Sequence, residues 1–452
     1  MLNSVMTRRD ILRASATGFG YLAFSALAQE SSAATSPLAE KKPHFDAKVK
    51  RVIFMFMEGG PSHVDTFDYK PSLAKYAGKK PPYAQPKAGG TGHRDSLMQP
   101  SPYKFKQCGQ SGLWISEVFP HLSKHADDLC LINGMHHATG QHEQGCVMMH
   151  TGEFRFSRPS MGSWIVYGLG AEAETLPAYM VVNPRERNTS NGCYSNGFLP
   201  AAYHATIMSN IGGRSKDSVA PIRNVTNPLY STKSQRLQLE LVQRMNQRYK
   251  KKQSDSRVDA VIESYERAFR MQSSVPQLLD LSKESAKTLA LYGLNRKKAT
   301  GFGMQCLLAR RMAESGVRFI EISQGGWDHH DSLQKKMPGS ARNIDQPIAG
   351  LISDLKQRGM WKDTLLVWGG EFGRTPAIED MKDKQFGRDH NGAGFTGELG
   401  WFAEKDKVHP HDVHSTILHL LGLNHQKLTY RYGGRDYTLT DVDGQVIKDI
   451  LA

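Results

Sequence analysis

The sequence predicts an α/β fold with a mostly parallel central sheet flanked by helices. Short apolar segments that run directly into polar loops alternate along the 452 residues with amphipathic helical segments. This alternation is typical of a parallel sheet with crossover helices. The first apolar segment, residues 52–57 (VIFMFM), has no polar position, as expected for a strand that is buried on both of its faces.

The same patterns predict further strands and helices in chain order. Four more apolar runs bounded by polar loops predict strands at residues 127–135, 177–183, 317–323 and 364–370. Apolar residues at helical spacing predict helices at residues 301–315 and 345–358. The charged, helix-prone composition of one region predicts a helical insertion at about residues 231–298, within a domain spanning residues 47–452.

The N-terminal residues predict an export signal. A twin arginine at positions 8 and 9 precedes a weakly apolar stretch, and Ala26 and Ala28 supply the small residues of a cleavage site. This pattern predicts a twin-arginine signal peptide over residues 1–28, a linker over residues 29–46, and an exported, periplasmic protein. An ordinary secretion signal or an N-terminal helix is the alternative. No later apolar run reaches the ~20 residues that span a bilayer, so no transmembrane segment is expected in the mature chain.

The composition is that of a soluble globular protein with a basic surface. Hydrophobic residues make up 39% of the chain and charged residues 23%, and the formal net charge is +14. This charge favours anionic substrates, glycans or surfaces as partners. No nucleic-acid-binding module is recognisable, so nucleic acid is not an expected partner. The five cysteines are irregularly spaced and predict isolated thiols rather than a disulfide framework.

Two polar clusters follow the first two predicted strands. Asp65 lies among other carboxylates and a histidine after the first strand, where carboxylates suit a divalent cation. Turn capping and local salt bridges are the alternative for this cluster. Residues 136–152 contain four histidines, and with a helical stride His142, Cys146 and His150 share one face. Four histidines in one glycine-rich segment indicate a functional role.

Two more clusters follow the last two predicted strands. Asp328 and His330 alternate, so in an extended loop both point the same way and bind one ion through oxygen and nitrogen. His329 between them is expected to face elsewhere and to be structural. Glu371 follows two glycines at the end of a buried strand, where a carboxylate is costly unless it binds a metal or pairs with a cation. Arg374 is either that cation or a fork for an anionic substrate oxygen.

We expect these clusters to converge, together with the loop that carries His390. In α/β sheets the site gathers beyond the carboxyl ends of the parallel strands. A metallohydrolase needs this arrangement, because its ligands come from several loops.

Five motifs occur in this order and carry a resemblance to a known family: GGPSHVDTFDYKP, HHATGQHEQGCVMMHTG, GGWDHH, GGEFGRTP and GRDHN. By them the chain resembles the bacterial domain of unknown function 1501 family, which is grouped with the alkaline-phosphatase-like superfamily that includes sulfatases. The resemblance covers nearly everything after the predicted linker. It implies a sheet flanked by helices, one or two divalent ions (zinc, calcium or manganese) at the strand ends, and hydrolysis or transfer of phosphate or sulfate esters.

The resemblance also implies roles for individual residues. By matching motif, the implied metal ligands are Asp65, Asp328, His330, Glu371 and His390. Glu371 stands where the superfamily commonly has an aspartate. The nucleophile position falls near His142, and Thr139 is the nearest hydroxyl. No cysteine lies in the Cys-x-Pro/Ala-x-Arg pattern of formylglycine sulfatases, so that mechanism is not supported.

We therefore expect an exported, metal-dependent hydrolase whose substrate is an anionic ester, such as a sulfated or phosphorylated glycan. The attacking group would be Thr139 or a water molecule, in either case activated by the metal. Arg374 would steady the anion, and His142 would act as acid or base. The alternative is a non-catalytic exported protein of the same fold that binds anionic polysaccharide or a protein partner.

Overall fold

The computed structural model describes most of the chain after residue 36. The described residues are 37–82, 96–185, 188, 192–212, 221–222, 229–252, 256–295, 300–378, 386–392 and 397–451. The predicted signal peptide (1–28) and the first part of the predicted linker (29–36) lie outside them. Within these ranges, no helix is both long enough and apolar enough to cross a membrane.

The centre of the fold is a five-stranded, entirely parallel sheet in the order β5-β4-β6-β1-β7. Its strands are β1 (Arg51–Met57), β4 (Tyr179–Val182), β5 (Thr206–Met208), β6 (Phe319–Gln324) and β7 (Thr364–Gly369). The predicted α/β fold with a mostly parallel sheet is therefore confirmed, as are four of the predicted strands. The edge strand β5 has only three residues, too few to produce a recognisable apolar run.

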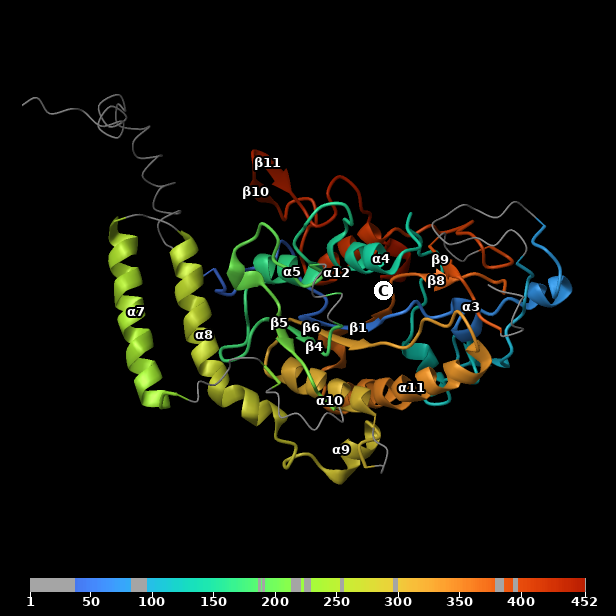
Figure 1. The fold of residues 1–452 in the computed structure, drawn as a ribbon, viewed down its shortest axis with the longest axis horizontal. Helices are drawn as coiled ribbons and strands as arrows, with labels where there is room; N and C mark the ends of the chain where they lie inside the picture. Colours follow the sequence, from blue (N-terminus) through green and yellow to red (C-terminus); the bar gives the residue numbers. More distant parts are fainter. Residues whose placement is uncertain are drawn as a thin grey trace, which may run out of the picture.

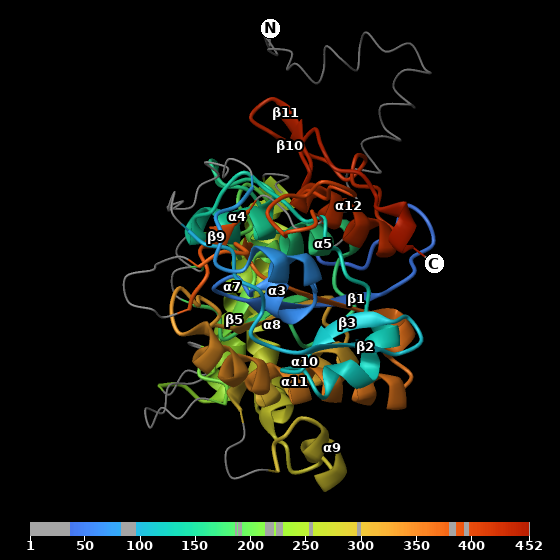
Figure 2. The same ribbon diagram turned by 90° about the vertical axis from the view of Figure 1, so that its right-hand side faces the viewer.

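Helices cover both faces of this sheet, as Figures 1 and 2 show. One face carries α10 (Gly301–Glu314) and α11 (Leu333–Gln357), and the other carries α4 (His142–Thr151), α5 (Met161–Leu169) and α12 (Pro410–Leu420). Alternate residues of β1 enter the two hydrophobic cores: Ile53, Met55 and Met57 on one side, Val52, Phe54 and Phe56 on the other. Each such side chain contributes about 1.5–3 kcal/mol on burial.

One prediction about secondary structure was wrong. Residues 127–135 form no strand: the 3₁₀ helix η2 (Leu122–Asp128) is followed by irregular chain, and Met135 makes a single bridge to Val408. The apolar side chains of this run are only partly buried, and Cys130 is exposed. The helix predicted at residues 345–358 is present as the C-terminal part of α11, which begins earlier, at Leu333, and continues past Pro338.

The helical insertion is confirmed and consists of three helices, α7 (Thr232–Lys252), α8 (Ser256–Leu279) and α9 (Ala286–Leu291). Helices α7 and α8 stand side by side at one end of the molecule (Figure 1). The C-terminal half of α8 joins the hydrophobic core through Met271, Val275 and Leu278.

Smaller elements complete the described chain. They are α3 (His63–Thr66), β2 (Phe105–Cys108), β3 (Leu113–Ser116), β8 (Gly373–Arg374), β9 (His390–Asn391), β10 (Tyr430–Tyr432), β11 (Arg435–Tyr437), η1 (Pro71–Tyr76), η3 (Ala201–Tyr203), η4 (Trp361–Asp363) and η5 (Lys448–Ile450). The described part of the predicted linker, residues 37–46, packs against the domain: Leu38 is buried and Lys41 donates to the carbonyl of Tyr167 at 2.6 Å.

Candidate metal centre

The polar clusters meet because of the strand order. Strands β6, β1 and β7 are neighbours and parallel, so the loops that follow them leave the same edge of the sheet side by side. The antiparallel pair β8–β9, in which Arg374 lies opposite His390, and the N-terminus of α4, which begins at His142, complete this edge.

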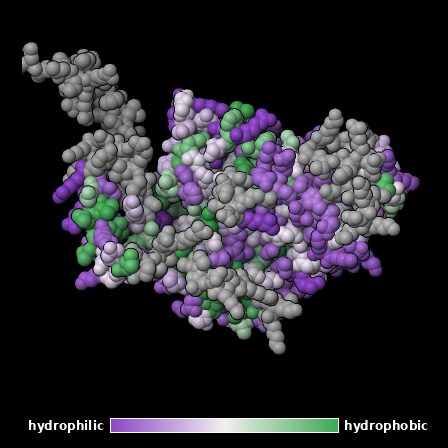
Figure 3. Space-filling model, viewed as in Figure 1, coloured by the Kyte–Doolittle hydropathy of each residue, from purple (hydrophilic) through white to green (hydrophobic). Residues whose placement is uncertain are grey.

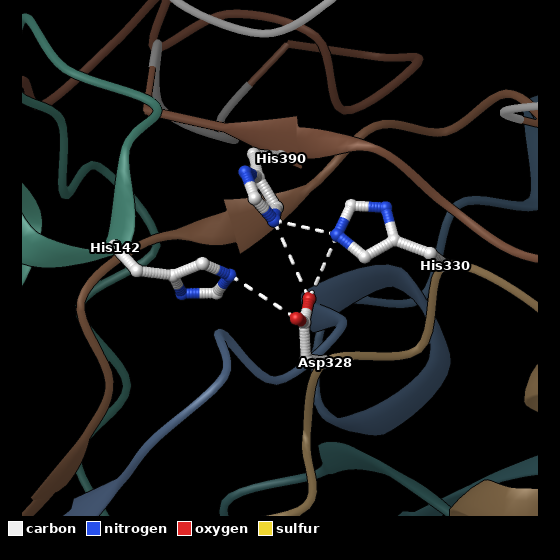
Figure 4. A group of neighbouring side chains, drawn as sticks. All are labelled: His142, Asp328, His330 and His390. Atoms are coloured by element: carbon white, nitrogen blue, oxygen red, sulfur yellow. Dashed lines mark hydrogen bonds and ion pairs between the residues drawn. The ribbon is translucent and has the colours of Figure 1, made fainter.

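Four side chains from three separate parts of the chain form one compact group here: His142, Asp328, His330 and His390 (Figure 4). One ligand atom from each lies within 4.8 Å of all the others. The Nε2 atom of His330 lies 2.8 Å from Asp328 Oδ1 and 2.8 Å from His390 Nε2. The Nε2 atom of His142 lies 3.2 Å from Asp328 Oδ2.

Two of the histidines are held so that Nε2 faces the group. His142 donates from Nδ1 to the Glu371 carboxylate at 2.6 Å, and His390 donates from Nδ1 to the carbonyl of Gly140 at 2.7 Å. With Nδ1 engaged in this way, Nε2 is the nitrogen left to coordinate a cation, which would displace the proton that Nε2 shares with Asp328, and such Nδ1 partners are typical of histidines that bind metals. Imidazole lone pairs and a carboxylate converging at this spacing are a donor set that a cation would satisfy.

Arg374 forms an ion pair with Asp328. Its side chain is fully buried, and Nη2 donates to Asp328 Oδ1 at 2.5 Å. Burial raises the pKa of Asp328, but the hydrogen bonds from the three histidines and the charge on Arg374 outweigh this and keep the pKa well below its ordinary value. Asp328 is therefore ionised at any pH near neutrality, as a metal ligand has to be.

The other N–H groups of Arg374 also have protein acceptors. Nε donates to the carbonyl of Gly60 at 2.9 Å, Nη1 donates to that of Arg388 at 2.9 Å, and Nη2 also donates to that of Gly59. The fifth N–H faces His330 Nε2 at 3.4 Å. In this geometry Arg374 positions a ligand and two loops, rather than offering a free fork to a substrate oxygen as predicted.

Glu371 lies behind His142 and outside the group of four. Its side chain is fully buried, and Oε1 accepts from His142 Nδ1 and from the backbone N–H of Gly59 at 2.9 Å. Gly59 has φ +116°, and a Cβ there would lie 2.4 Å from the backbone nitrogen of Asp328, so only glycine fits. The predicted ligand Glu371 is thus placed as the group that orients His142. Burial lowers the pKa of His142, but its hydrogen bonds to Asp328 and Glu371 raise it to about 9.

Asp65 is also placed elsewhere. It is fully buried and binds the guanidinium of Arg388 through two contacts, at 2.6 and 3.2 Å, and it accepts from the Ser62 hydroxyl at 2.5 Å. Asp65 is thus engaged in a salt bridge, as in the alternative reading of this cluster, but its partner Arg388 is distant in the sequence rather than local. The pair ties the loop before His390 to α3.

Thr139 is buried, and its hydroxyl is engaged with neighbours. It donates to Gln144 Oε1 at 2.7 Å and accepts from the backbone N–H of Gln141 at 3.2 Å. Thr139 therefore shapes the turn that leads into α4 and is not a member of the group of four. His329 is buried and turned toward Ser340 Oγ at 3.3 Å, which agrees with the prediction that it faces elsewhere.

Sequence reasoning missed three supporting contacts. The carbonyl of Gly140 orients His390, and a backbone carbonyl leaves no trace in a sequence. His411 and His414 of α12 donate to the carbonyls of Gly152 and Met149 at 2.6 and 2.8 Å. These two histidines fasten the C-terminus of α4, whose other end carries His142.

A protein-family model described as "Protein of unknown function (DUF1501)" matches residues 49–451. No curated protein matches the chain.

Proposed function

The chain belongs to the DUF1501 family of proteins of unknown function, and we propose that it is an exported, metal-dependent hydrolase of phosphate or sulfate esters. Its class would be that of the alkaline-phosphatase-like enzymes. The observation that carries the proposal is the group of three histidines and one aspartate at the carboxyl edge of the sheet. Histidines oriented through Nδ1 are a hallmark of metal ligands.

The donor set favours some metals over others. Three imidazole nitrogens with one carboxylate suit Zn²⁺, and also Mn²⁺. Calcium takes oxygen ligands, so of the three metals expected from the sequence it fits least. Since the described residues contain one such group, we propose a single ion held by His142, Asp328, His330 and His390.

A bound ion would polarise the ester oxygen and lower the pKa of an attacking water. The chain supplies the positioning. Glu371 keeps His142 in one tautomer, Gly140 does the same for His390, and Arg374 keeps Asp328 ionised and in place. The Asp328 side chain is 45% exposed, so an ester can approach the group from solvent.

The attacking group is better assigned to water than to Thr139. The Thr139 hydroxyl already donates to Gln144 and accepts from Gln141. It would have to break both contacts to serve as a nucleophile. Because His142 is held between Asp328 and Glu371, we assign it the role of a metal ligand rather than that of a general acid or base.

The test is metal content and turnover measured on the same preparations. Protein purified without chelator should contain about one zinc or manganese ion per chain, and a panel of phosphate and sulfate esters should reveal a hydrolysed substrate. Asp328→Ala and His330→Ala should lose both properties. His204→Ala is the matched control and should keep both, since it removes an exposed histidine whose ring bonds the carbonyl of the adjacent Ala205 at 2.8 Å.

The alternative is a non-catalytic protein that binds an anionic polysaccharide or a protein partner. The engagement of Thr139 and Arg374 by protein atoms favours it. Stoichiometric metal without turnover on any ester, together with glycan binding that survives Asp328→Ala, would establish this alternative. Absence of metal from wild-type protein after incubation with zinc and manganese would refute the proposed centre.

A further inference from the structure

The helices α7 and α8 form an arm, and in the part of the chain that the structure describes it is α8 that packs against the domain, on η3 and α10. Arg267 of α8 donates to the carbonyls of Ala173 and Leu176 at 3.1 and 2.8 Å, and three apolar residues farther along α8 enter the core. Helix α7 contacts α8 and, at the end of the molecule in Figure 1, has no element of the described chain on its other side.

Several of the described contacts between α7 and α8 are polar. Arg236 donates to both oxygens of Glu266 at 2.9 and 3.1 Å, and Gln243 donates to the same carboxylate. Farther along, Gln272 donates to Gln235 at 2.7 Å. A two-helix hairpin ordinarily buries its apolar stripe in the seam between the helices, and here the described part of the seam contains these polar side chains.

Apolar side chains of α7 face outward instead. Leu237, Leu241 and Met245 are 57%, 55% and 61% exposed. Their four-residue spacing places them in one stripe along successive turns. Figure 3 shows hydrophobic residues gathered at the surface of this arm.

The same face is positively charged. Lys233, Arg244 and Arg248 are exposed, and the helical repeat places Lys233 and Arg244 along one edge of the apolar stripe and Arg248 in line with it, on the turn after Met245. The whole of α7 contains seven lysines and arginines and a single glutamate. An apolar stripe bordered by Lys and Arg is typical of a helix that lies in the interface of a membrane.

We propose that the outer face of α7 binds the surface of an anionic lipid bilayer. Leu237, Leu241 and Met245 would enter the boundary between headgroups and acyl chains, and Arg244 and Arg248 would contact lipid phosphates. A second copy of the chain fits less well. It would bring a second basic helix against the first, and a stripe of three side chains falls short of the ~800 Å² per partner of a stable dimer.

The test is co-sedimentation of the full chain with vesicles of phosphatidylcholine, with and without phosphatidylglycerol. The wild type should bind the anionic vesicles, and binding should weaken as salt is added. The triple variant Leu237→Gln/Leu241→Gln/Met245→Gln should lose at least tenfold in affinity. Arg244→Gln and Arg248→Gln should each lose about fivefold. Every variant is made in the full chain, so any vesicle binding by other segments is the same in the variants and in the wild type.

Val442→Gln is the matched control, since Val442 is an apolar residue 85% exposed at a distant position in the sequence, and it should bind as the wild type does. Circular dichroism and bound metal should be unchanged in every variant. Two results would overturn the proposal: vesicle binding unaffected by the triple variant, or no vesicle binding by the wild type. A wild-type dimer that the triple variant dissociates, without vesicle binding, would assign the stripe to self-association instead.

Discussion

The variant Glu371→Gln tests whether the carboxylate of Glu371 binds the metal itself or orients the metal ligand His142. Glu371 contacts His142 at 2.6 Å and the N–H of Gly59 at 2.9 Å and is fully buried. Glutamine keeps the shape and one acceptor oxygen but removes the charge. Metal would still have all four members of the group available, so binding should persist with lower affinity.

The magnitude follows from the contact that is weakened. A hydrogen bond to a charged group contributes about 1.5–3 kcal/mol, and loss of a group that orients a metal ligand costs about 10–100-fold in metal affinity. We therefore expect Glu371→Gln to bind one ion per chain with an affinity about 10–100-fold lower. Titration against a chelator of known zinc affinity measures this.

Glu58→Gln is the matched control. Glu58 is a buried carboxylate at the end of β1 that pairs with Arg185 at 2.9 Å, and its replacement should leave metal affinity within about twofold. If Glu371→Gln abolishes stoichiometric binding as Asp328→Ala does, Glu371 is a direct ligand. If its affinity equals that of the wild type, the proposed orienting role is wrong.

Three further predictions concern stability. Arg374→Ala should lower the free energy of unfolding of the metal-free protein by about 3 kcal/mol or more, because buried carbonyls lose their donors; urea denaturation measures it. Asp65→Ala should cost about 3–5 kcal/mol, since it leaves Arg388 buried without its carboxylate, yet the folded fraction should keep one metal ion. Burial lowers the pKa of His150, but the charge of Glu321 at 2.9 Å outweighs it and raises the pKa well above the ordinary value, so this pair should lose its stabilising effect as the pH rises.

The sign of the pH effect is fixed by linkage. A raised folded-state pKa gives stability that is complete below the unfolded value of about 6.5 and is lost as the pH rises through the folded value. The pH dependence of unfolding should therefore flatten on the alkaline side in Glu321→Gln, and a profile equal to that of the wild type would contradict the proposed His150–Glu321 pairing.

The other two predictions have their own refuting outcomes. If Asp65→Ala loses its bound metal, Asp65 is a metal ligand after all. An Arg374→Ala protein as stable as the wild type would contradict the contacts assigned to Arg374.

Much of the fold could be predicted because burial leaves a local pattern. The all-apolar run 52–57 became a central strand with its side chains in two cores. Residues 127–135 show a similar pattern and form no strand. The apolar side chains of this second segment are only partly buried, and strand formation depends on whether another strand is available to pair with the backbone.

The candidate site could be predicted in part, because some of its residues are close together in the sequence. Asp328 and His330 are close in sequence, and an extended loop brings both to the group. Asp65 carries an equally suggestive pattern, but Arg388, more than 300 positions away, pairs with it. Nothing in the sequence around a carboxylate tells whether its partner is an ion or a distant guanidinium.

The sequence by itself therefore determined the parallel α/β architecture, the helical insertion and the polar clusters at the strand ends, since each depends on residues close together in the chain. Only the tertiary structure decided which polar groups share one centre. It placed His142 beside Asp328, His330 and His390, which the family resemblance had already grouped, and it placed Glu371 and Arg374 next to these residues as supports. It also turned the apolar stripe of α7 outward. The physical reason is that electrostatic pairing and side-chain exposure depend on distances in space, which the strand order and the packing of helices set.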